Sequence, residues 1–270
     1  PGFYGSMPND TIRTFSRGGS DITGAIVARA TGSDLYENWT DVSGVLMADP
    51  RIVEDPEVID IITYNELREL SYMGATVLHE DAIFPVRLMG IPINIRNTNK
   101  PEDPGTMIVA SAEGAGKNVI TGIAGKPGFS SITIEKDMMN SEVGFTRKVL
   151  SVLESESISF EHMPSGIDTL SIILATPVLE GKKERILRAI CDAVSPDSVF
   201  VEDSIALIAV VGRGMRSTKG TAARTLDAVA DAGINLVMID QGSSELNIIL
   251  GVKEADLQKT IAAIYGEFGR

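Results

Sequence analysis

The alternation of hydrophobic and polar positions predicts two halves with different architectures. In residues 1–110, short apolar runs typical of strands alternate with stretches in which apolar residues recur every three or four positions, as in amphipathic helices. This order favours an α/β domain with a parallel sheet, which binds ligands at the carboxyl ends of its strands. The expected strands are 11–15, 35–42 and 91–97, the expected helices are 21–31, 64–75 and 80–90, and a polar Pro/Gly-rich linker is expected at 97–106.

The second half of the chain contains an internal repeat. When the sequence is shifted by 76 positions, LSIIL (170–174) falls on LNIIL (246–250) without a gap. Other coinciding pairs are Ile132/Ile208, Met139/Met215, Gly144/Gly220, Leu150/Leu226, Ile158/Ile234 and Gly166/Gly242. Each copy is expected to run strand, helix, strand, strand, helix, which is most of a ferredoxin-like βαββαβ module.

A count of strands predicts how the two modules are connected. The first copy ends with a strand at 197–202, whereas the second ends in a helix and lacks its fourth strand. The strand at 118–125 is unassigned and can supply it. The first module (126–202) is then an insertion within the second (118–125 with 203–270).

This arrangement makes a prediction about strand pairing. Residues 118–125 are expected to pair with 205–211 or 245–251 of the second module. The alternative is a hairpin with 129–136, closed by the GKPG turn at 125–128.

Composition and charge narrow the class of protein. The chain is 43% hydrophobic with a net charge of -13, which indicates a globular protein without a nucleic-acid surface. Its single cysteine, Cys191, is expected to pack in a helix and excludes a disulfide framework. The longest apolar run (205–211) is too short to span a membrane, no signal peptide is recognised, and a cytoplasmic location is expected. Because the sequence opens with PGFYG rather than Met, we expect it to begin inside a larger protein.

The segment FSRGGSD (15–21) is the first candidate site. Gly18 and Gly19 permit positive φ and close approach of another group, and Ser20 or Asp21 is expected to cap the following helix. With Arg17 beside the helix N-terminus, the turn could hold an anion. An ordinary glycine turn with a good N-cap explains the same residues.

Five segments, in the same order, resemble those of aspartate kinases. They are FSRGGSD, WTDVSGVLMADPRIV (39–53), YMGATVLH (72–79), IPINIRNTNKPEDPGT (91–106) and the repeat that ends in DQGSSELNIIL (240–250). The resemblance covers nearly the whole chain. It implies the carboxyl-terminal part of an amino-acid-kinase domain (1–110), an α/β fold, followed by two α+β ACT modules that bind regulatory amino acids.

The resemblance also assigns roles to the kinase residues. It implies that Arg17, Gly18, Gly19 and Ser20 bind L-aspartate, and that Asp21 is catalytic, either holding Mg²⁺ or orienting the attacking carboxylate. Phosphoryl transfer then depends on positioning and charge, without a protein nucleophile.

For ATP, the resemblance implies that Thr40 and Asp41 contact the nucleotide and that Arg51 reaches its phosphates. By residue type alone, the first two are a strand-end cap and Arg51 is a solvated loop charge. The chain departs from the family pattern in three places: Leu46 replaces an aromatic residue, Thr76 a lysine and Glu80 a proline. His79 is interpreted as a structural residue at a helix end.

The expected activity is therefore phosphorylation of L-aspartate by ATP and Mg²⁺ under feedback control. The Lys-Phe-Gly-Gly phosphate-binding segment of the family is absent from these 270 residues, so the chain alone is expected to be inactive. The alternatives are a regulatory, amino-acid-binding chain without activity and a sister amino-acid kinase.

Differences between the two repeats suggest the effector. Glu161 and Ser159 stand where the second repeat has Val237 and Asn235, and a lysine side chain needs an acidic acceptor. The expected effector is L-lysine, with L-threonine second, unless Glu161 simply faces solvent. The candidate effector-binding residues are Ser141, Gly144, Phe145, Ser159, Phe160 and Glu161, with Asp168 behind Glu161. A homodimer through the ACT modules is expected near 241–247, the alternative being a plain surface hairpin.

Overall fold

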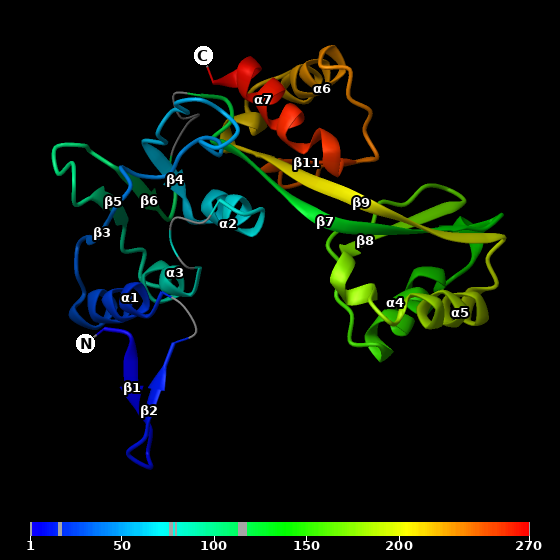
Figure 1. Cartoon of the computed structure of the whole chain (residues 1–270), viewed down its shortest axis with the longest axis horizontal. Helices are drawn as coiled ribbons and strands as arrows, with labels where there is room; N and C mark the ends of the chain where they lie inside the picture. The colour runs from blue at the N-terminus through cyan, green and yellow to red at the C-terminus, as the bar shows by residue number, and fades with distance from the viewer. Residues whose placement is uncertain (1, 16–17, 76–77, 79, 113–117, 270) are drawn as a thin grey trace.

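The computed structural model describes residues 2–15, 18–75, 78, 80–112 and 118–269 of the chain. Figure 1 shows a small mixed sheet with three helices at one end and a long sheet with four helices at the other. A hairpin of β1 (Tyr4–Ser6) and β2 (Ile12–Thr14) projects beside the first helix. In the part of the chain described, no helix is long and apolar enough to cross a membrane.

The first sheet has the strand order β3-β5-β6-β4. Its strands are β3 (Tyr36–Thr40), β4 (Ile61–Thr63), β5 (Ile93–Asn97) and β6 (Thr106–Val109). The pairs β3/β5 and β4/β6 are parallel, as the pattern predicts, but β5/β6 is antiparallel. Strands β4 and β6 were missed because each has only three or four residues, too few to show a period.

The segment 97–106 is not a linker, contrary to the sequence-based expectation. It turns the chain back between β5 and β6, and Thr106 already belongs to the sheet. Gly105 makes this return possible, since its φ is +73° and a Cβ there would overlap the carbonyl oxygen of Ile95.

Three helices accompany this sheet: α1 (Gly19–Thr31), α2 (Tyr64–Tyr72) and α3 (Glu80–Arg87), close to the predicted ranges. The predicted cap of α1 is wrong. The N-cap is Gly18 in the left-handed conformation, and no side chain caps the helix. Ser20 and Asp21 therefore lie within the first turn, where a carboxylate still interacts favourably with the helix dipole.

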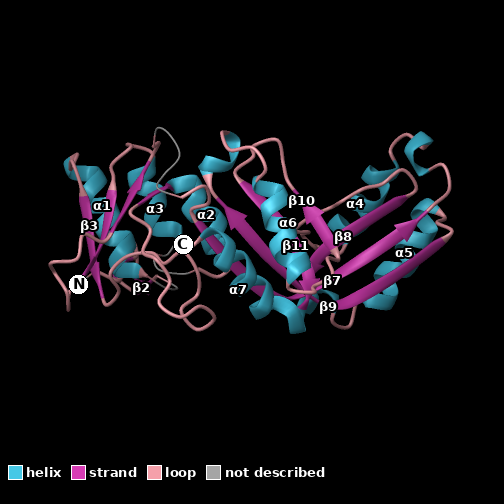
Figure 2. Cartoon of the chain, turned by 90° about the horizontal axis from the view of Figure 1, so that it is seen from above, coloured by secondary structure: helices cyan, strands magenta, loops and turns pink. Residues whose placement is uncertain are grey.

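The second sheet has the order β10-β11-β9-β7-β8 and is organised by two long strands. These are β7 (Gly122–Glu135) and β9 (Ser198–Val211), which run antiparallel through both modules (Figure 2). The outer strands are β8 (Thr169–Ala175), β11 (Asn247–Lys253) and β10 (Met238–Asp240). The four helices are α4 (Phe145–Ser155), α5 (Lys183–Val194), α6 (Thr221–Asp231) and α7 (Leu257–Phe268).

Strand β7 pairs as the count of strands in the sequence predicts. Its first residues, from Gly122, pair with the end of β9 up to Val211, whereas Ser131–Glu135 pair with Ser198–Glu202 at the start of β9. The alternative hairpin does not form, because β7 continues through the GKPG segment with only a register shift. The same two strands therefore serve first one module and then the other.

The two copies of the repeat share the glycine that starts their first helix but differ in the strand that follows it. Helices α4 and α6 follow Gly144 and Gly220, whose φ values are 82° and 84°. The expected second strand of the first copy is reduced to isolated bridges at His162 and Ser165, since the intervening Pro164 has no N–H to donate.

The buried residues form two separate clusters. One runs without interruption from the first sheet into the second module, and the other fills the first module alone. The second of the predicted modules is thus packed as one body with the predicted kinase part (1–110). Cys191 lies on α5 but is exposed, contrary to expectation, because the buried side of that helix carries Ile186, Ile190 and Val194.

We expect Gly105→Ala to destabilise the protein by about 2–4 kcal/mol, because it adds a steric overlap to an unfavourable φ. Gly32→Ala is the matched control, since Gly32 has a φ of +62° but nothing within 4 Å of its Cβ position. It should cost only about 1–2 kcal/mol. Urea unfolding measures both, and equal losses would contradict the role given to the Ile95 carbonyl.

Candidate functional site

The predicted catalytic residue, Asp21, is held against β3. Asn38 donates a hydrogen bond to Asp21 Oδ1 at 3.2 Å and another to Tyr36 Oη at 3.0 Å. Tyr36 Oη in turn donates to the backbone carbonyl of Asp21 at 3.2 Å. Helix and strand approach this closely because Gly24 has no Cβ, which would lie 2.6 Å from Tyr36 Oη.

The pKa of Tyr36 is raised, first by burial and also by the nearby charge of Asp21, against a lowering by the Asn38 hydrogen bond. The phenol therefore remains a donor at neutral pH. Asn38 orients the Asp21 carboxylate and Tyr36 holds the Asp21 backbone, and a positioning or metal-binding carboxylate needs such a fixed orientation.

The glycine turn before α1 is only partly described. Ser16 and Arg17 lie outside the described residues, so the predicted aspartate contact of Arg17 is not visible. Gly19 is buried, and a Cβ on it would lie 2.8 Å from Phe3 Cα and 2.9 Å from the Phe15 ring. Its close neighbours are thus aromatic residues of this chain.

The predicted nucleotide residues lie at the edge where parallel strands end. Thr40 is the last residue of β3, and its hydroxyl donates to Asp41 Oδ1 at 3.2 Å. Thr98, directly after β5, donates its N–H and its hydroxyl to the Thr40 carbonyl at 2.8 and 2.9 Å. This edge is the expected ligand-binding edge of the sheet.

Arg51 stands apart from this group. Its guanidinium makes a bidentate pair with Asp49, with Nη2 to Oδ2 at 2.6 Å, and its side chain is 86% exposed. The hydrogen bond from Arg51 is the main reason that the pKa of Asp49 is lowered. The family departure Leu46 forms a bridge with Val58, whereas Thr76 and His79 lie outside the described residues.

The candidate effector residues fall into three places in the first module. Ser141 and Gly144 precede α4, and the Phe145 ring is buried in the module core, 3% exposed. Ser159 and Phe160 line a pocket of about 550 Å³ together with residues of α4. The structure therefore does not gather all six residues around one space.

Glu161 does not simply face solvent. Its carboxylate accepts a hydrogen bond from the Tyr72 hydroxyl at the end of α2. The ammonium of Lys126 lies 5.9 Å from the Tyr72 ring centroid and 5.6 Å from that of Phe129, which closes the contact between α2 and β7. The residue expected to recognise an effector thus touches the kinase part directly.

The most buried charge in the described chain, Glu66, was not predicted. It is 0% exposed, lies in the first turn of α2 and forms a capping box with Thr63. Its carboxylate also accepts hydrogen bonds from Thr121 Oγ1 at 2.6 Å and from the Arg213 N–H at 2.9 Å. Arg213 Nη1 completes an ion pair at 2.9 Å. The sequence signal Thr-x-x-Glu indicates the cap but not the ion pair.

The backbone that carries Arg213 packs against the segment 118–121, which leads into β7. A Cβ on Gly212 would lie 2.6 Å from Ile120 Cα, and one on Gly214 would lie within 3.1 Å of Val119 backbone atoms. Glycines at these positions let the two segments meet beside Glu66, so that both can donate to its carboxylate.

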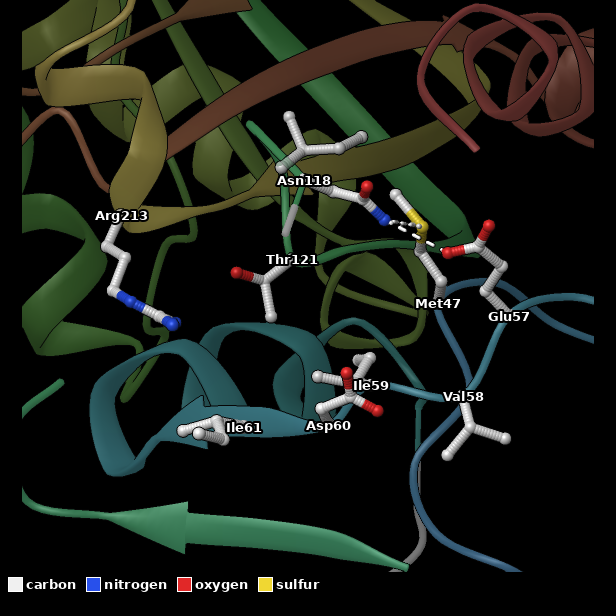
Figure 3. A pocket seen from close by; sticks show the side chains of 10 residues that line it. Met47, Glu57, Val58, Ile59, Asp60, Ile61, Asn118, Thr121 and Arg213 are labelled. Atoms are coloured by element: carbon white, nitrogen blue, oxygen red, sulfur yellow. Dashed lines mark hydrogen bonds between the residues drawn. The ribbon is translucent and has the colours of Figure 1, made fainter. Parts of the chain in front are cut away.

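A pocket of about 400 Å³ lies next to this ion pair, between the kinase part and the second module (Figure 3). The kinase side contributes Met47 and residues 57–61, and the other side contributes Asn118, Ile120, Thr121 and Arg213. Asn118 Nδ2 donates to Glu57 Oε2 at 3.1 Å across the wall. No sequence pattern indicated this pocket, because its walls come from distant segments.

The carboxylate of Glu66 should stabilise the fold only while it is ionised. Burial tends to raise its pKa, but the hydrogen bonds from Thr121, Arg213 and Thr63 outweigh burial and lower it. A lowered pKa means that this stabilisation is present above the ordinary value of 4.5 and is lost as the pH falls below it.

We therefore expect Glu66→Gln to cost about 3–5 kcal/mol at pH 7, since Arg213 loses its buried partner. The difference in unfolding free energy between the variant and the wild type should shrink as the pH is lowered from 5 towards 3. Over this range the wild-type carboxylate takes up about one proton and loses its ionic stabilisation. Thermal unfolding across this range measures it. Glu54→Gln, on an exposed loop carboxylate, is the control, and a pH-independent difference would rule out the charge as the cause.

Comparisons with known proteins agree with this architecture. The amino acid kinase family model matches residues 1–97, and an ACT domain model matches residues 208–268. Aspartokinase 3 of Bacillus subtilis (strain 168) is 45% identical over 269 residues, which are 99% of this chain and 59% of that protein.

Solved structures give the same result. The aspartate kinase of Clostridium acetobutylicum, described as an allosteric enzyme, has a TM-score of 0.91 and 56% identity over 99% of this chain and 62% of its own. E. coli aspartokinase III in complex with aspartate and ADP has a TM-score of 0.79 at 25% identity, covering 98% of this chain and 59% of its own. The same enzyme in complex with lysine and aspartate has a TM-score of 0.73 at 25% identity, covering 100% and 59%.

The chain thus spans about three fifths of the length of the relatives it matches. Its first 97 residues carry the amino acid kinase match, an ACT domain lies near its end, and aspartokinases match it from end to end. The chain is therefore similar to aspartokinases over its whole length.

Proposed function

We propose that the protein phosphorylates the side-chain carboxylate of L-aspartate with ATP, giving 4-phospho-L-aspartate, under feedback control by an amino acid bound to its ACT modules. One observation carries this proposal. The Asp21 carboxylate is held in a fixed orientation by Asn38 on β3, the strand that ends in Thr40 and Asp41. The E. coli relative is known in complex with aspartate and ADP, which supports aspartate and an adenine nucleotide as ligands of this protein.

In this proposal each part of the site has a separate task. Arg17 holds a carboxylate of aspartate through its planar fork of N–H donors, and Asp21 orients the reacting groups from the start of α1. Thr40 and Asp41 contact the nucleotide at the strand edge. Arg51 reaches its phosphates by exchanging its Asp49 partner for a phosphate, and high exposure makes this exchange inexpensive.

The residues present fit a magnesium ion that is carried mainly by the nucleotide. No cluster of three possible metal ligands occurs among the described residues, and Mg²⁺ typically uses one or two carboxylates together with substrate phosphates and water. Asp21 can supply one such carboxylate, since Asn38 binds only its Oδ1. When bound, Mg²⁺ neutralises charge on the transferring phosphoryl group.

We further propose L-lysine as the effector of the first module, with L-threonine as the second candidate. The Glu161 carboxylate can accept the side-chain ammonium of lysine, and the E. coli relative is known in complex with lysine. Because Glu161 already binds Tyr72 of α2, a ligand at this carboxylate would compete with a contact to the kinase part.

The proposed domains are 1–110, 126–202, and 118–125 with 203–270.

A homodimer through the ACT modules is also proposed. The edge strand β10 offers unpaired backbone groups for such an interface, whereas the outer edge of β8 is already bridged to His162 and Ser165. Asn247, within the proposed contact region, donates to Glu69 of its own chain at 2.7 Å.

The substrate proposal predicts separate effects on aspartate and nucleotide binding. Arg17→Lys keeps the charge but loses the bidentate fork, so L-aspartate affinity should fall about tenfold to a hundredfold while ADP affinity is unchanged. Asp21→Asn should weaken binding of Mg·ADP relative to ADP alone. Isothermal calorimetry measures both, with Arg13→Lys and Asp34→Asn as exposed controls. A protein that binds neither aspartate nor ADP would contradict the proposal.

The effector proposal predicts that Glu161→Gln lowers the affinity for L-lysine at least about tenfold, since a charged acceptor is removed from an ammonium group. L-norleucine, which lacks the side-chain amine, should bind weakly to both proteins. Glu184→Gln, on an exposed carboxylate of α5, is the control. Lysine binding that survives Glu161→Gln would place the effector elsewhere, and binding of threonine alone would reverse the order of the two candidates.

A further inference from the structure

We propose that the pocket at the junction of the kinase part and the second ACT module is a binding site for an α-amino acid with a short aliphatic side chain. This site is separate from the effector position in the first module. It is lined by the segment 57–61 on one side and by the segment 118–121 with Arg213 on the other. The inference does not depend on the proposed phosphorylation.

The pocket presents opposite charges to the same space. Figure 3 shows the Arg213 side chain reaching in from the second module, with Asp60 on the kinase side below Thr121. Within the described residues, the Asp60 carboxylate has no hydrogen-bond or ion-pair partner. A zwitterion can place its carboxylate against the guanidinium and its ammonium against Asp60.

The polar walls are fixed before a ligand arrives. Glu66 binds Arg213 through Nη1, at 3.2 and 2.9 Å from its two oxygens, so the guanidinium has a set orientation. On the other wall Glu57 accepts from Asn118 Nδ2, and its backbone N–H donates to Tyr265 Oη at 3.0 Å. Preorganised groups of this kind lose little entropy on binding.

The remaining lining is aliphatic. Ile59 and Ile120 are buried, and Ile61 and Val58 are about half exposed at the sides. A pocket of about 400 Å³ accommodates a small ligand, and such surfaces favour an aliphatic side chain. A simple anion would meet Asp60 and Glu57, and a simple cation would meet Arg213, so the charges favour a ligand that carries both.

Both walls are needed for the site, and they belong to different parts of the protein. A ligand bound there stabilises the packed arrangement of the kinase part on the second module, by the linkage between binding and folding. It would therefore raise the melting temperature.

The test is calorimetric titration of the whole chain with L-valine as the probe. Isobutylamine and isovalerate are the matched controls, because they keep the aliphatic part and lose the carboxylate and the ammonium group respectively. We expect valine to bind and both controls to bind at least about tenfold more weakly, since each loses one charged hydrogen-bonded contact. Valine should also raise the melting temperature in a concentration-dependent way.

Two variants locate the binding. Asp60→Asn should reduce valine affinity about tenfold or more, whereas Asp55→Asn, on a nearby exposed carboxylate, should not. Ile61→Trp, which fills the pocket from β4, should abolish binding while leaving the far-ultraviolet circular dichroism unchanged. These substitutions leave Glu66 and Arg213 in place, so the junction itself is retained.

The proposal is overturned if valine fails to bind, if isovalerate binds as tightly as valine, or if Asp60→Asn and Ile61→Trp leave valine affinity intact. Glu161→Gln separates this site from the first-module effector position. Valine binding that is unchanged in Glu161→Gln supports the junction site, and binding lost with that variant would place valine in the first module instead.

Discussion

The buried carboxylate of Glu66 is the contact on which the arrangement of the whole chain depends. A fully buried charge is tolerated only when its hydrogen-bonding capacity is met. Here the donors come from three places: the start of its own helix, the segment just before β7 and the turn after β9. Neither the kinase part nor the second module can satisfy it alone. This explains why one continuous apolar core runs through both, whereas the first module has its own.

Helix α2 connects this junction to both ACT modules. Glu66 and Glu69 contact the second module, through Arg213 and Asn247, and Tyr72 contacts Glu161 in the first. Residues three apart lie on neighbouring positions of a helix surface, so one side of a nine-residue helix touches both repeats. Because α2 directly follows β4 of the kinase sheet, regulatory modules and kinase part share a rigid element.

The sequence predicted the place of some residues of the proposed site but not the contacts of others. The positions of Thr40 and Asp41 at the end of a strand follow from hydrophobic patterning, because a strand that ends in polar residues is visible locally. The partner of Asp21 was not predictable, since Asn38 reaches it only when α1 packs on β3. For the effector residues, analysis of the first repeat grouped Phe145 with Glu161, but the Phe145 ring is buried in the core and Glu161 binds Tyr72.

The sequence by itself determined the class of each half, the repeat, and the pairing of residues 122–125 with the second module, because periodicity, self-similarity and strand counts can be read along the chain. Tertiary structure alone decided the direction of β6, the exposure of Cys191 and the partner of Glu66. Arg213 lies 147 residues from Glu66 along the chain. A pairing across such a separation depends on how two folded parts meet, and no local pattern in either segment encodes that meeting.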